Sequence, residues 1–147
     1  MRKFRYNENL NVVFVNENDC RENLQLNELL KVNKRLIIRN PEDSKRFVIL
    51  MYRENNQKWS NEKFFLLHEI GHFICNDLAD EASADEYAIE RIGYSVAAKA
   101  LRDLSLEVMT YENVDLKLRL NIFKSLLFRL KTIETLAEAR SIELQLD

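Results

Sequence analysis

Two histidines four positions apart are the feature of this sequence that most restricts how it can fold. His68 and His72 are the only histidines among the 147 residues, and Glu69 stands between them in the pattern His-Glu-x-x-His. On an α-helix, residues i and i+4 lie about one turn apart on the same face, so both imidazoles can reach one metal ion. The motif therefore predicts a helix that carries a metal site.

Zinc is the metal that this pattern favours. A catalytic zinc site usually has three protein ligands and one open position, and the ion lowers the pKa of water to about 7. A neighbouring carboxylate can then accept a proton from that water as the water attacks a peptide carbonyl. We therefore expect His68 and His72 to be ligands and Glu69 to be the general base, with a third ligand elsewhere.

The length and composition of the chain favour a single domain, residues 1–147. Hydrophobic residues make up 46% of the chain and charged residues 31%, which suits a globular core. The net charge is −2 and the basic residues are scattered, so no surface for nucleic acid is expected. Two cysteines, no apolar leader and no apolar run of ~18 residues predict a cytoplasmic protein with no membrane contact.

Few turn-forming residues occur, which predicts a mainly helical α+β fold: the chain has two glycines and one proline. The apolar patterns predict a strand at 11–16, a helix at 21–33, and strands at 34–39 and 46–53 that form a hairpin in a small antiparallel sheet. They also predict helices of about 15 residues from Ser60, from Asp80 to Arg91, and from 96 to 109. Residues 1–60 thus supply the sheet, 61–92 the metal-site helices and 95–147 the C-terminal helices.

The last predicted element is a helix of about 30 residues with a regular apolar stripe. Its members recur at alternating steps of four and three: Leu116, Leu120, Phe123, Leu127 and Leu130. Such a stripe usually covers the core of its own domain, so this use is expected here, with a dimer or partner surface as the alternative.

The third metal ligand should come from an acidic segment that directly follows the histidines. Asp77, Asp80, Glu81 and Asp85 all compete for this position. We favour Glu81, because a helix that crosses the first one can direct Glu81 at the metal. Asp85, one turn later, then hydrogen-bonds the outer nitrogen of a ligand histidine. Asp77 remains the alternative, because a glycine-free connection of eight residues separates His72 from Glu81.

Two stretches of the sequence resemble the ImmA/IrrE-type metallopeptidases. They are Glu-Lys-Phe-Phe-Leu-Leu-His-Glu-Ile-Gly-His at 62–72 and Glu-Ala-Ser-Ala-Asp-Glu-Tyr-Ala at 81–88. That family carries H-E-[LI]-G-H on a helix after a strand, then E-x-x-A-[ND]-x-[FY]-A. The resemblance, which covers roughly residues 34–92, implies a compact zincin-like domain. It also implies that His68, His72 and Glu81 hold Zn²⁺, with Glu69 as base and Asp85 as a supporting residue.

The resemblance also implies a function. Well-known family members are bacterial or mobile-element proteins that cleave a transcriptional repressor. The expected activity is therefore that of a zinc endopeptidase of narrow specificity whose partner is a protein substrate. Residues 95–147 match no family motif, and no helix-turn-helix is apparent. The alternative is a zinc-binding interaction module with little or no cleavage, against which the intact Glu69 argues, because a binding site needs no base.

In a zincin arrangement, the strand before the active-site helix commonly offers its edge to an extended peptide. The candidate is the strand at 46–53, through its central residues Phe47, Val48, Ile49, Leu50 and Met51. Strand order is not visible in one sequence, so an internal strand is an equal alternative.

A hydrogen-bond donor should also stabilise the oxyanion that forms during peptide hydrolysis. The candidates are three tyrosines near the motif in the sequence or on the neighbouring strand: Tyr87, Tyr94 and Tyr52. A packed aromatic ring with its hydroxyl at the surface is the alternative for each of them.

Overall fold

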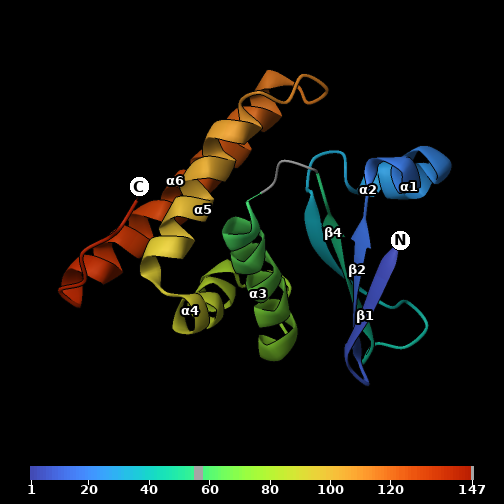
Figure 1. Ribbon diagram of the computed structural model, residues 1–147, viewed down its shortest axis with the longest axis horizontal. Coiled ribbons are helices and arrows are strands. Elements are labelled where there is room, and N and C mark those ends of the chain that lie inside the picture. The colour runs from blue at the N-terminus through green and yellow to red at the C-terminus, as the bar shows by residue number, and fades with distance from the viewer. Residues whose placement is uncertain (55–57, 147) are drawn as a thin grey trace.

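A four-stranded sheet forms one side of the molecule, and helices form the rest (Figure 1). This computed structural model describes residues 1–54 and 58–146. The strands are β1 (Arg2–Asn7), β2 (Leu10–Val15), β3 (Arg35–Arg39) and β4 (Phe47–Tyr52). The helices are α1 (Glu17–Glu22), α2 (Leu24–Leu29), α3 (Trp59–Cys75), α4 (Glu81–Ile92), α5 (Tyr94–Val108) and α6 (Leu116–Ala139). The predicted α+β class with a predominance of helix is confirmed.

The sheet is mixed rather than wholly antiparallel. Its order is β1-β2-β4-β3, and β1/β2 and β3/β4 are antiparallel pairs, which confirms the predicted hairpin. β2 and β4 run parallel, however. After β2 the chain passes through α1 and α2 and enters the sheet again at its far edge, so β4 returns in the direction of β2. The prediction of an antiparallel sheet is therefore wrong for the central pair, and β1 was not predicted.

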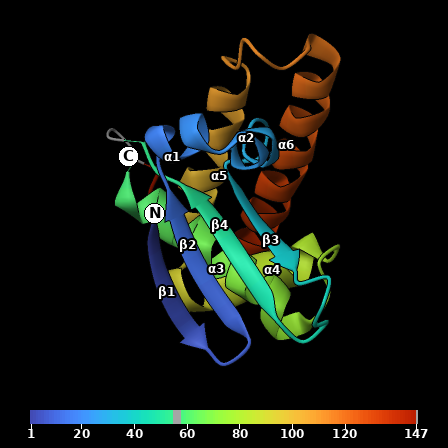
Figure 2. The ribbon, with the colours of Figure 1, turned by 90° about the vertical axis from the view of Figure 1, so that its right-hand side faces the viewer.

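Side chains of the sheet pack on both of its faces. Alternate residues of a strand point to opposite sides, so Phe47, Ile49 and Met51 of β4 join the main core with the long helices. Leu50 instead packs with Leu30, just after α2. Figure 2 looks onto the sheet and shows α3 and the C-terminal helices behind it, with α1 and α2 at one end. The main core therefore lies between the sheet and the helical side.

Two helices differ from their predicted bounds by more than two residues. The predicted helix at 21–33 is wrong as one element: the range holds the end of α1, then α2, and no helix after Leu30. Asn23 separates the two helices, because it ends α1 and its side chain accepts two backbone N–H groups of α2. The final helix has 24 residues instead of about 30. It ends at Ala139, and Ser141 then adopts a left-handed conformation with φ 55°. Within the described residues, no helix combines the length and apolarity that crossing a bilayer requires.

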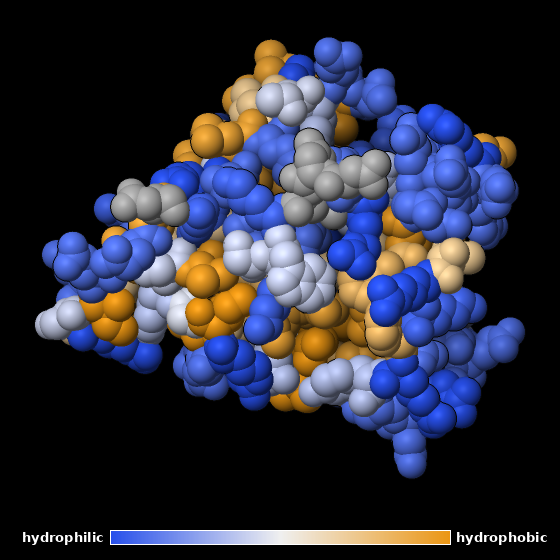
Figure 3. Space-filling model, in the orientation of Figure 1, coloured by the Kyte–Doolittle hydropathy of each residue, from blue (hydrophilic) through white to orange (hydrophobic). Residues whose placement is uncertain are grey.

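The predicted stripe of α6 faces the core only in part. Leu116, Leu120 and Leu127 are exposed, Phe123 is half-buried, and Leu130 packs against the main core. The fully buried residues of the core-facing side include Leu126 and Ile133, which the predicted stripe does not contain. Figure 3, in the orientation of Figure 1, shows that apolar patches also lie among polar residues on this face of the molecule. Since Leu126 and Ile133 are seven positions apart, the position between them at a helical step of three is 129, which holds an arginine. The buried side of α6 therefore includes a charged residue.

Helices α3 and α4 approach each other closely at Gly71. A Cβ atom at this position would lie 2.9 Å from the Cα atom of Ala84 and 3.0 Å from the Ala84 carbonyl oxygen. Both neighbours are backbone atoms, so the helices would have to separate to admit a methyl group. Gly71 therefore sets the distance between the helix that carries the two histidines and the helix that carries Glu81 and Asp85.

We expect Gly71→Ala to destabilise the protein by about 1–3 kcal/mol, the usual range for overpacking. The loss should appear as a lower urea midpoint with an unchanged slope. Cys75→Ala is the matched control, because Cys75 is exposed on the same helix; its effect should stay within about 0.5 kcal/mol. Equal stability of both variants would contradict the close approach at Gly71.

Candidate metal centre

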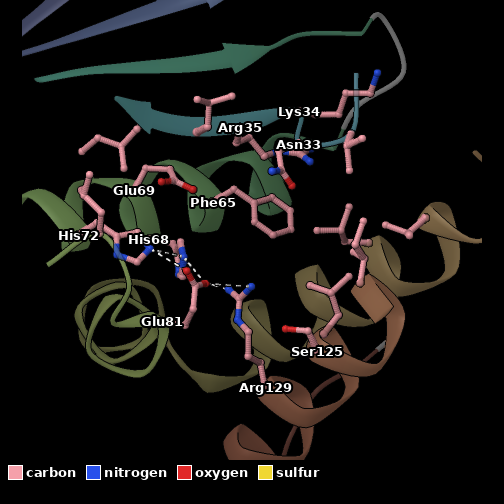
Figure 4. A pocket seen from close by; sticks show the side chains of 18 of the residues that line it. Asn33, Lys34, Arg35, Phe65, His68, Glu69, His72, Glu81, Ser125 and Arg129 are labelled. Atoms are coloured by element: carbon pink, nitrogen blue, oxygen red, sulfur yellow. Dashed lines mark hydrogen bonds and ion pairs between the residues drawn. The ribbon is translucent and has the colours of Figure 1, made fainter. Parts of the chain in front are cut away.

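Three candidate ligands converge where α3 meets the beginning of α4 (Figure 4). His68 and His72 are buried on α3, and Glu81 is the first residue of α4. One ligand atom from each lies within 4.8 Å of the others, so the group can hold a metal ion. The three residues that the sequence predicts as ligands thus lie together.

Asn76 makes a tight turn in the short connection between α3 and α4. Asn76 ends α3 in a left-handed conformation with φ 50°, and its N–H bonds back to the His72 and Phe73 carbonyls. Asparagine tolerates this conformation better than most residues. Asp80 then caps α4 by accepting the Ser83 N–H at 2.9 Å. The chain thereby brings Glu81 back to the histidines without a glycine in the turn.

The hydrogen bonds of both imidazoles leave their Nε2 atoms available to a metal. His68 Nδ1 lies 2.7 Å from Asp85 Oδ1, and His72 Nδ1 lies 3.0 Å from the Asp77 carbonyl oxygen. An ionised carboxylate and a carbonyl only accept, so each Nδ1 carries a proton and donates. In the neutral rings the lone pairs are therefore on Nε2, and these two atoms lie 3.1 Å apart. Asp85 has the supporting position that the sequence predicts.

Glu81 completes the donor set. Its two oxygens lie 3.1 Å from His68 Nε2 and 3.2 Å from His72 Nε2. These spacings are close to the roughly 3.3 Å that separates ligand atoms around a tetrahedral zinc ion with bonds of about 2.0 Å. Burial by itself raises the pKa of Glu81, but hydrogen bonds from both histidines outweigh it and hold the pKa well below its usual range. Two imidazoles and an ionised carboxylate therefore fit Zn²⁺.

Asp77, the alternative third ligand, has a different place. Its carboxylate accepts the Ala79 N–H at 2.9 Å, and its backbone oxygen accepts the His72 ring proton. The residue therefore supports the ligand His72 through the backbone while its side chain shapes the turn. The geometry favours Glu81 over Asp77 as the third ligand.

Glu69 lies beside the ligands and makes none of the hydrogen bonds that hold them. It lines a cavity of about 520 Å³ together with His68, His72 and Glu81, and its carboxylate lies between the histidines and Phe65 in Figure 4. Burial raises the pKa of Glu69, and the nearby His68 and His72 partly offset this. The carboxylate thus has a raised affinity for a proton, as a general base requires.

The cavity extends away from the ligands between β3 and the C-terminal helices. Phe65 of α3, Val108 of α5, and Ile122 and Leu126 of α6 form apolar walls. Residues 32–37 border the opposite side, with Asn33, Lys34 and Arg35 labelled in Figure 4. The candidate metal-binding group, which consists of His68, His72 and Glu81, therefore opens into a space that can hold part of a larger molecule.

Arg129 is the site residue that the sequence patterns do not identify. It projects from α6 toward the metal-binding group (Figure 4). Its guanidinium donates to both oxygens of Asp85 and lies 3.5 Å from Glu81 Oε2. An arginine on the otherwise apolar side of α6 that contains Leu126 and Ile133 is the one signal that could have indicated it.

The predicted substrate strand, with Phe47, Val48, Ile49, Leu50 and Met51, has no free edge. β4 pairs with β2 on one side and β3 on the other, so its backbone groups are already used within the sheet. The prediction is wrong because strand order depends on how β2 and β4 associate, which local residue patterns do not reveal. The edge strand on this side is β3.

The three predicted oxyanion donors do not border the cavity. Tyr87 lies under the Arg91 guanidinium, 3.4 Å from the ring centroid, and Tyr94 and Tyr52 have arginine and lysine partners of the same kind. Among the described residues that line the cavity, the tyrosine is Tyr111. The alternative reading of the three candidates, as packed aromatics, agrees with these contacts.

The stability of the metal-free protein should depend on pH through His68. Burial lowers its pKa, but the hydrogen bonds with Asp85 and Glu81 outweigh burial and raise the pKa to about 9, from 6.5 for the free side chain. Because the folded value is the higher one, this stabilisation is complete below pH 6.5 and is lost as the pH rises through 9. We expect urea unfolding of metal-free protein to show a loss on the order of 3 kcal/mol over this window.

His68→Gln is the control for this pH dependence. The variant cannot take up the proton, so its free energy of unfolding should change much less over the same range. A wild-type curve as flat as that of the variant would contradict the raised pKa of His68.

Known proteins give no further guide to this site. Comparison with protein-family models, with curated protein sequences and with solved structures returns no match in any of the three. The functional interpretation therefore depends on the geometry of the site and on the sequence motifs.

Proposed function

We propose that this protein is a zinc-dependent endopeptidase that hydrolyses a peptide bond in a protein substrate. The observation that carries the proposal is the convergence of His68, His72 and Glu81 with Glu69 beside them at one end of a cavity. A purely structural zinc site is closed by its protein ligands, whereas a catalytic site has three ligands and access to substrate. Three ligands at an open cavity with an unused carboxylate support catalysis.

The residues of the site can perform distinct steps of peptide hydrolysis. When bound, zinc supplies Lewis acidity, which polarises a carbonyl group and acidifies water. Glu69 accepts a proton from the attacking water and passes it to the leaving amine. Asp85 and the Asp77 carbonyl hold the Nδ1 protons of the two histidines, so that neither ring turns away from the metal.

The free edge of β3 is a place where an extended peptide can bind. At one end of the β3–β4 pair, the Tyr52 N–H donates to the Lys34 oxygen; at the other end, the Asn40 N–H donates to the Arg46 oxygen. In an antiparallel pair, the alternate residues direct their N–H and C=O groups outward. The outward groups here belong to Arg35, Ile37 and Arg39. Since 32–37 border the cavity, a peptide added to this edge would pass the metal-binding group.

The backbone of Ile37 offers a specific test of this peptide site. We expect Ile37→Pro to raise KM roughly three- to tenfold, because proline removes one outward N–H donor and a hydrogen bond contributes about 0.5–1.5 kcal/mol. The fold should tolerate it, since proline is acceptable on an edge strand where the N–H faces outward. Ile37→Val keeps the N–H and is the control. Identical KM values for the two variants would contradict peptide pairing at β3.

The biological role proposed here follows the resemblance to ImmA/IrrE-type metallopeptidases. In that role the substrate is a transcriptional repressor of a bacterial or mobile-element system, and cleavage relieves repression. The two motifs support this, because the predicted positions of His68, His72, Glu81 and Asp85 agree with the geometry found around the cavity.

A cleavage screen tests the enzymatic proposal directly. Zinc-loaded protein would be incubated with a peptide library made from a bacterial proteome, and new termini would be identified by mass spectrometry. We expect cleavage at a small set of sites, with no such termini after chelation of the metal. A complete absence of new termini with zinc-loaded, folded protein would overturn the proposal.

A further inference from the structure

Arg129 connects the C-terminal helix α6 to the candidate metal centre. Its side chain is only 15% exposed although it is charged. Arginine is rarely buried without partners, since removing its charge from water is costly. The partners of Arg129 therefore indicate what the residue does.

The main partner of Arg129 is the carboxylate of Asp85. Arg129 Nε donates to Asp85 Oδ2 at 2.9 Å, and Nη2 donates to Oδ1 at 2.7 Å. Two parallel bonds between a planar guanidinium and a carboxylate fix the orientation of both groups. Asp85 therefore has little freedom to rotate within the site.

The oxygen that Arg129 fixes is the one that binds His68. Asp85 Oδ1 accepts from His68 Nδ1 at 2.7 Å and from Arg129 Nη2 at the same distance. The Nη2 atom lies 3.3 Å from His68 Nδ1, but both of these nitrogens carry protons and cannot bond each other. A fixed Asp85 therefore favours the His68 tautomer that has its lone pair on Nε2.

Arg129 also balances the negative charge of the site. Glu69, Glu81 and Asp85 bring three negative charges to the metal centre when ionised, and Zn²⁺ would supply two positive charges. The Arg129 guanidinium supplies the third positive charge. It lies 3.5 Å from Glu81 Oε2 and is bonded to Asp85. The zinc-loaded site with Arg129 is therefore neutral, which suits a partly buried position.

We propose that Arg129 is a positioning residue of the metal centre, which acts through Asp85 to hold the Nδ1 proton of His68 and so directs Nε2 at the metal. This proposal rests on the proposed zinc site. It gives α6 a role in the site that helix packing alone would not require. Lysine should replace Arg129 poorly, because an ammonium group has the charge but not the planar pair of donors.

The ring protons of the two histidines can test this role without a substrate. The chain has only two imidazoles, so proton and ¹⁵N NMR of labelled protein should show one Nδ1–H signal from each, and a His72→Gln spectrum assigns them. His72 is an internal control, because its Nδ1 proton binds the Asp77 carbonyl. We expect Arg129→Lys to shift or broaden the His68 signal and to leave the His72 signal in place, with and without zinc.

Zinc affinity, measured by competition with a chelating dye, is the second readout. Residues that orient ligand histidines typically change metal affinity 10–100-fold, so a loss of roughly this size is expected for Arg129→Lys and Arg129→Met. Arg119→Met is the matched control on α6, since Arg119 bonds the Met109 carbonyl instead. The lysine variant keeps a buried cation opposite Asp85, so the test does not depend on folding of the methionine variant.

Each outcome of these measurements has a distinct meaning. An unchanged His68 signal together with wild-type zinc affinity in Arg129→Lys would overturn the positioning role. A wild-type protein that binds no zinc would overturn the proposed function instead. In that case the metal-free spectra would still show whether Arg129 holds the His68 proton through Asp85, and an unchanged signal there would overturn this inference as well.

Discussion

Glu69→Gln is expected to reduce peptide cleavage by roughly 10²–10⁴-fold, the usual contribution of a general base, while zinc remains bound. Glutamine has nearly the shape of glutamate but cannot accept the proton of the attacking water. Glu69 makes no hydrogen bond to His68, His72 or Glu81 among the contacts of the described residues, so its replacement should leave the metal-binding group intact.

The measurement compares initial rates on peptides found in the cleavage screen, with zinc content determined by elemental analysis of the same samples. Glu86→Gln is the matched control, because Glu86 is exposed on α4. Wild-type turnover in Glu69→Gln would exclude Glu69 as the base and would favour another mechanism. Loss of zinc in this variant would show instead that Glu69 takes part in holding the metal.

Glu81→Ala is expected to weaken zinc binding by more than about 100-fold. Substitutions of residues that merely support a ligand already cost 10–100-fold, and Glu81 supplies an ionised oxygen close to both Nε2 atoms. Hydrogen bonds from both histidines lower the pKa of Glu81 in the metal-free protein, so its carboxylate is ionised near neutral pH. Activity should fall with the metal.

Asp77→Asn is the control for Glu81→Ala. Its side chain contacts the turn, and the backbone carbonyl that binds His72 is kept in the variant. Chelator competition should therefore give a near wild-type affinity for Asp77→Asn. Equal zinc affinity in Glu81→Ala and wild type would exclude Glu81 as a ligand, and a loss confined to Asp77→Asn would identify Asp77 in its place.

The local part of the site could be read from the sequence because its residues lie on two consecutive helices. The spacing of His68 and His72 fixes their common face once α3 forms, and α3 forms because its apolar residues pack on the sheet. Because only eight residues separate His72 from Glu81, the acidic segment that follows must lie near the histidines. Glu81 and Asp85 are one turn apart on α4, so a single helix places one at the metal and the other at His68.

The free sheet edge at β3 and the distant residue Arg129 could not be predicted in this way. β4 looked like an edge strand because a hairpin alone has two free edges, but the parallel pairing with β2 places β4 inside the sheet and leaves β3 as the strand of this hairpin with a free edge. α6 has two apolar stripes, and the more regular one is exposed at Leu116, Leu120 and Leu127. Arg129 interrupts the buried stripe between Leu126 and Ile133, so the sequence pattern of this side resembles that of a solvent-exposed one.

The sequence by itself determined the metal-binding group, because its His-Glu-x-x-His spacing and the acids after it act through helical periodicity over less than 20 residues. Tertiary structure alone decided what surrounds that group. It set which strand has free backbone groups, and it brought Arg129 to Asp85 across 44 positions of the chain. The physical reason is that such contacts depend on which of several compatible faces and edges pack together, and that choice is made by the whole core.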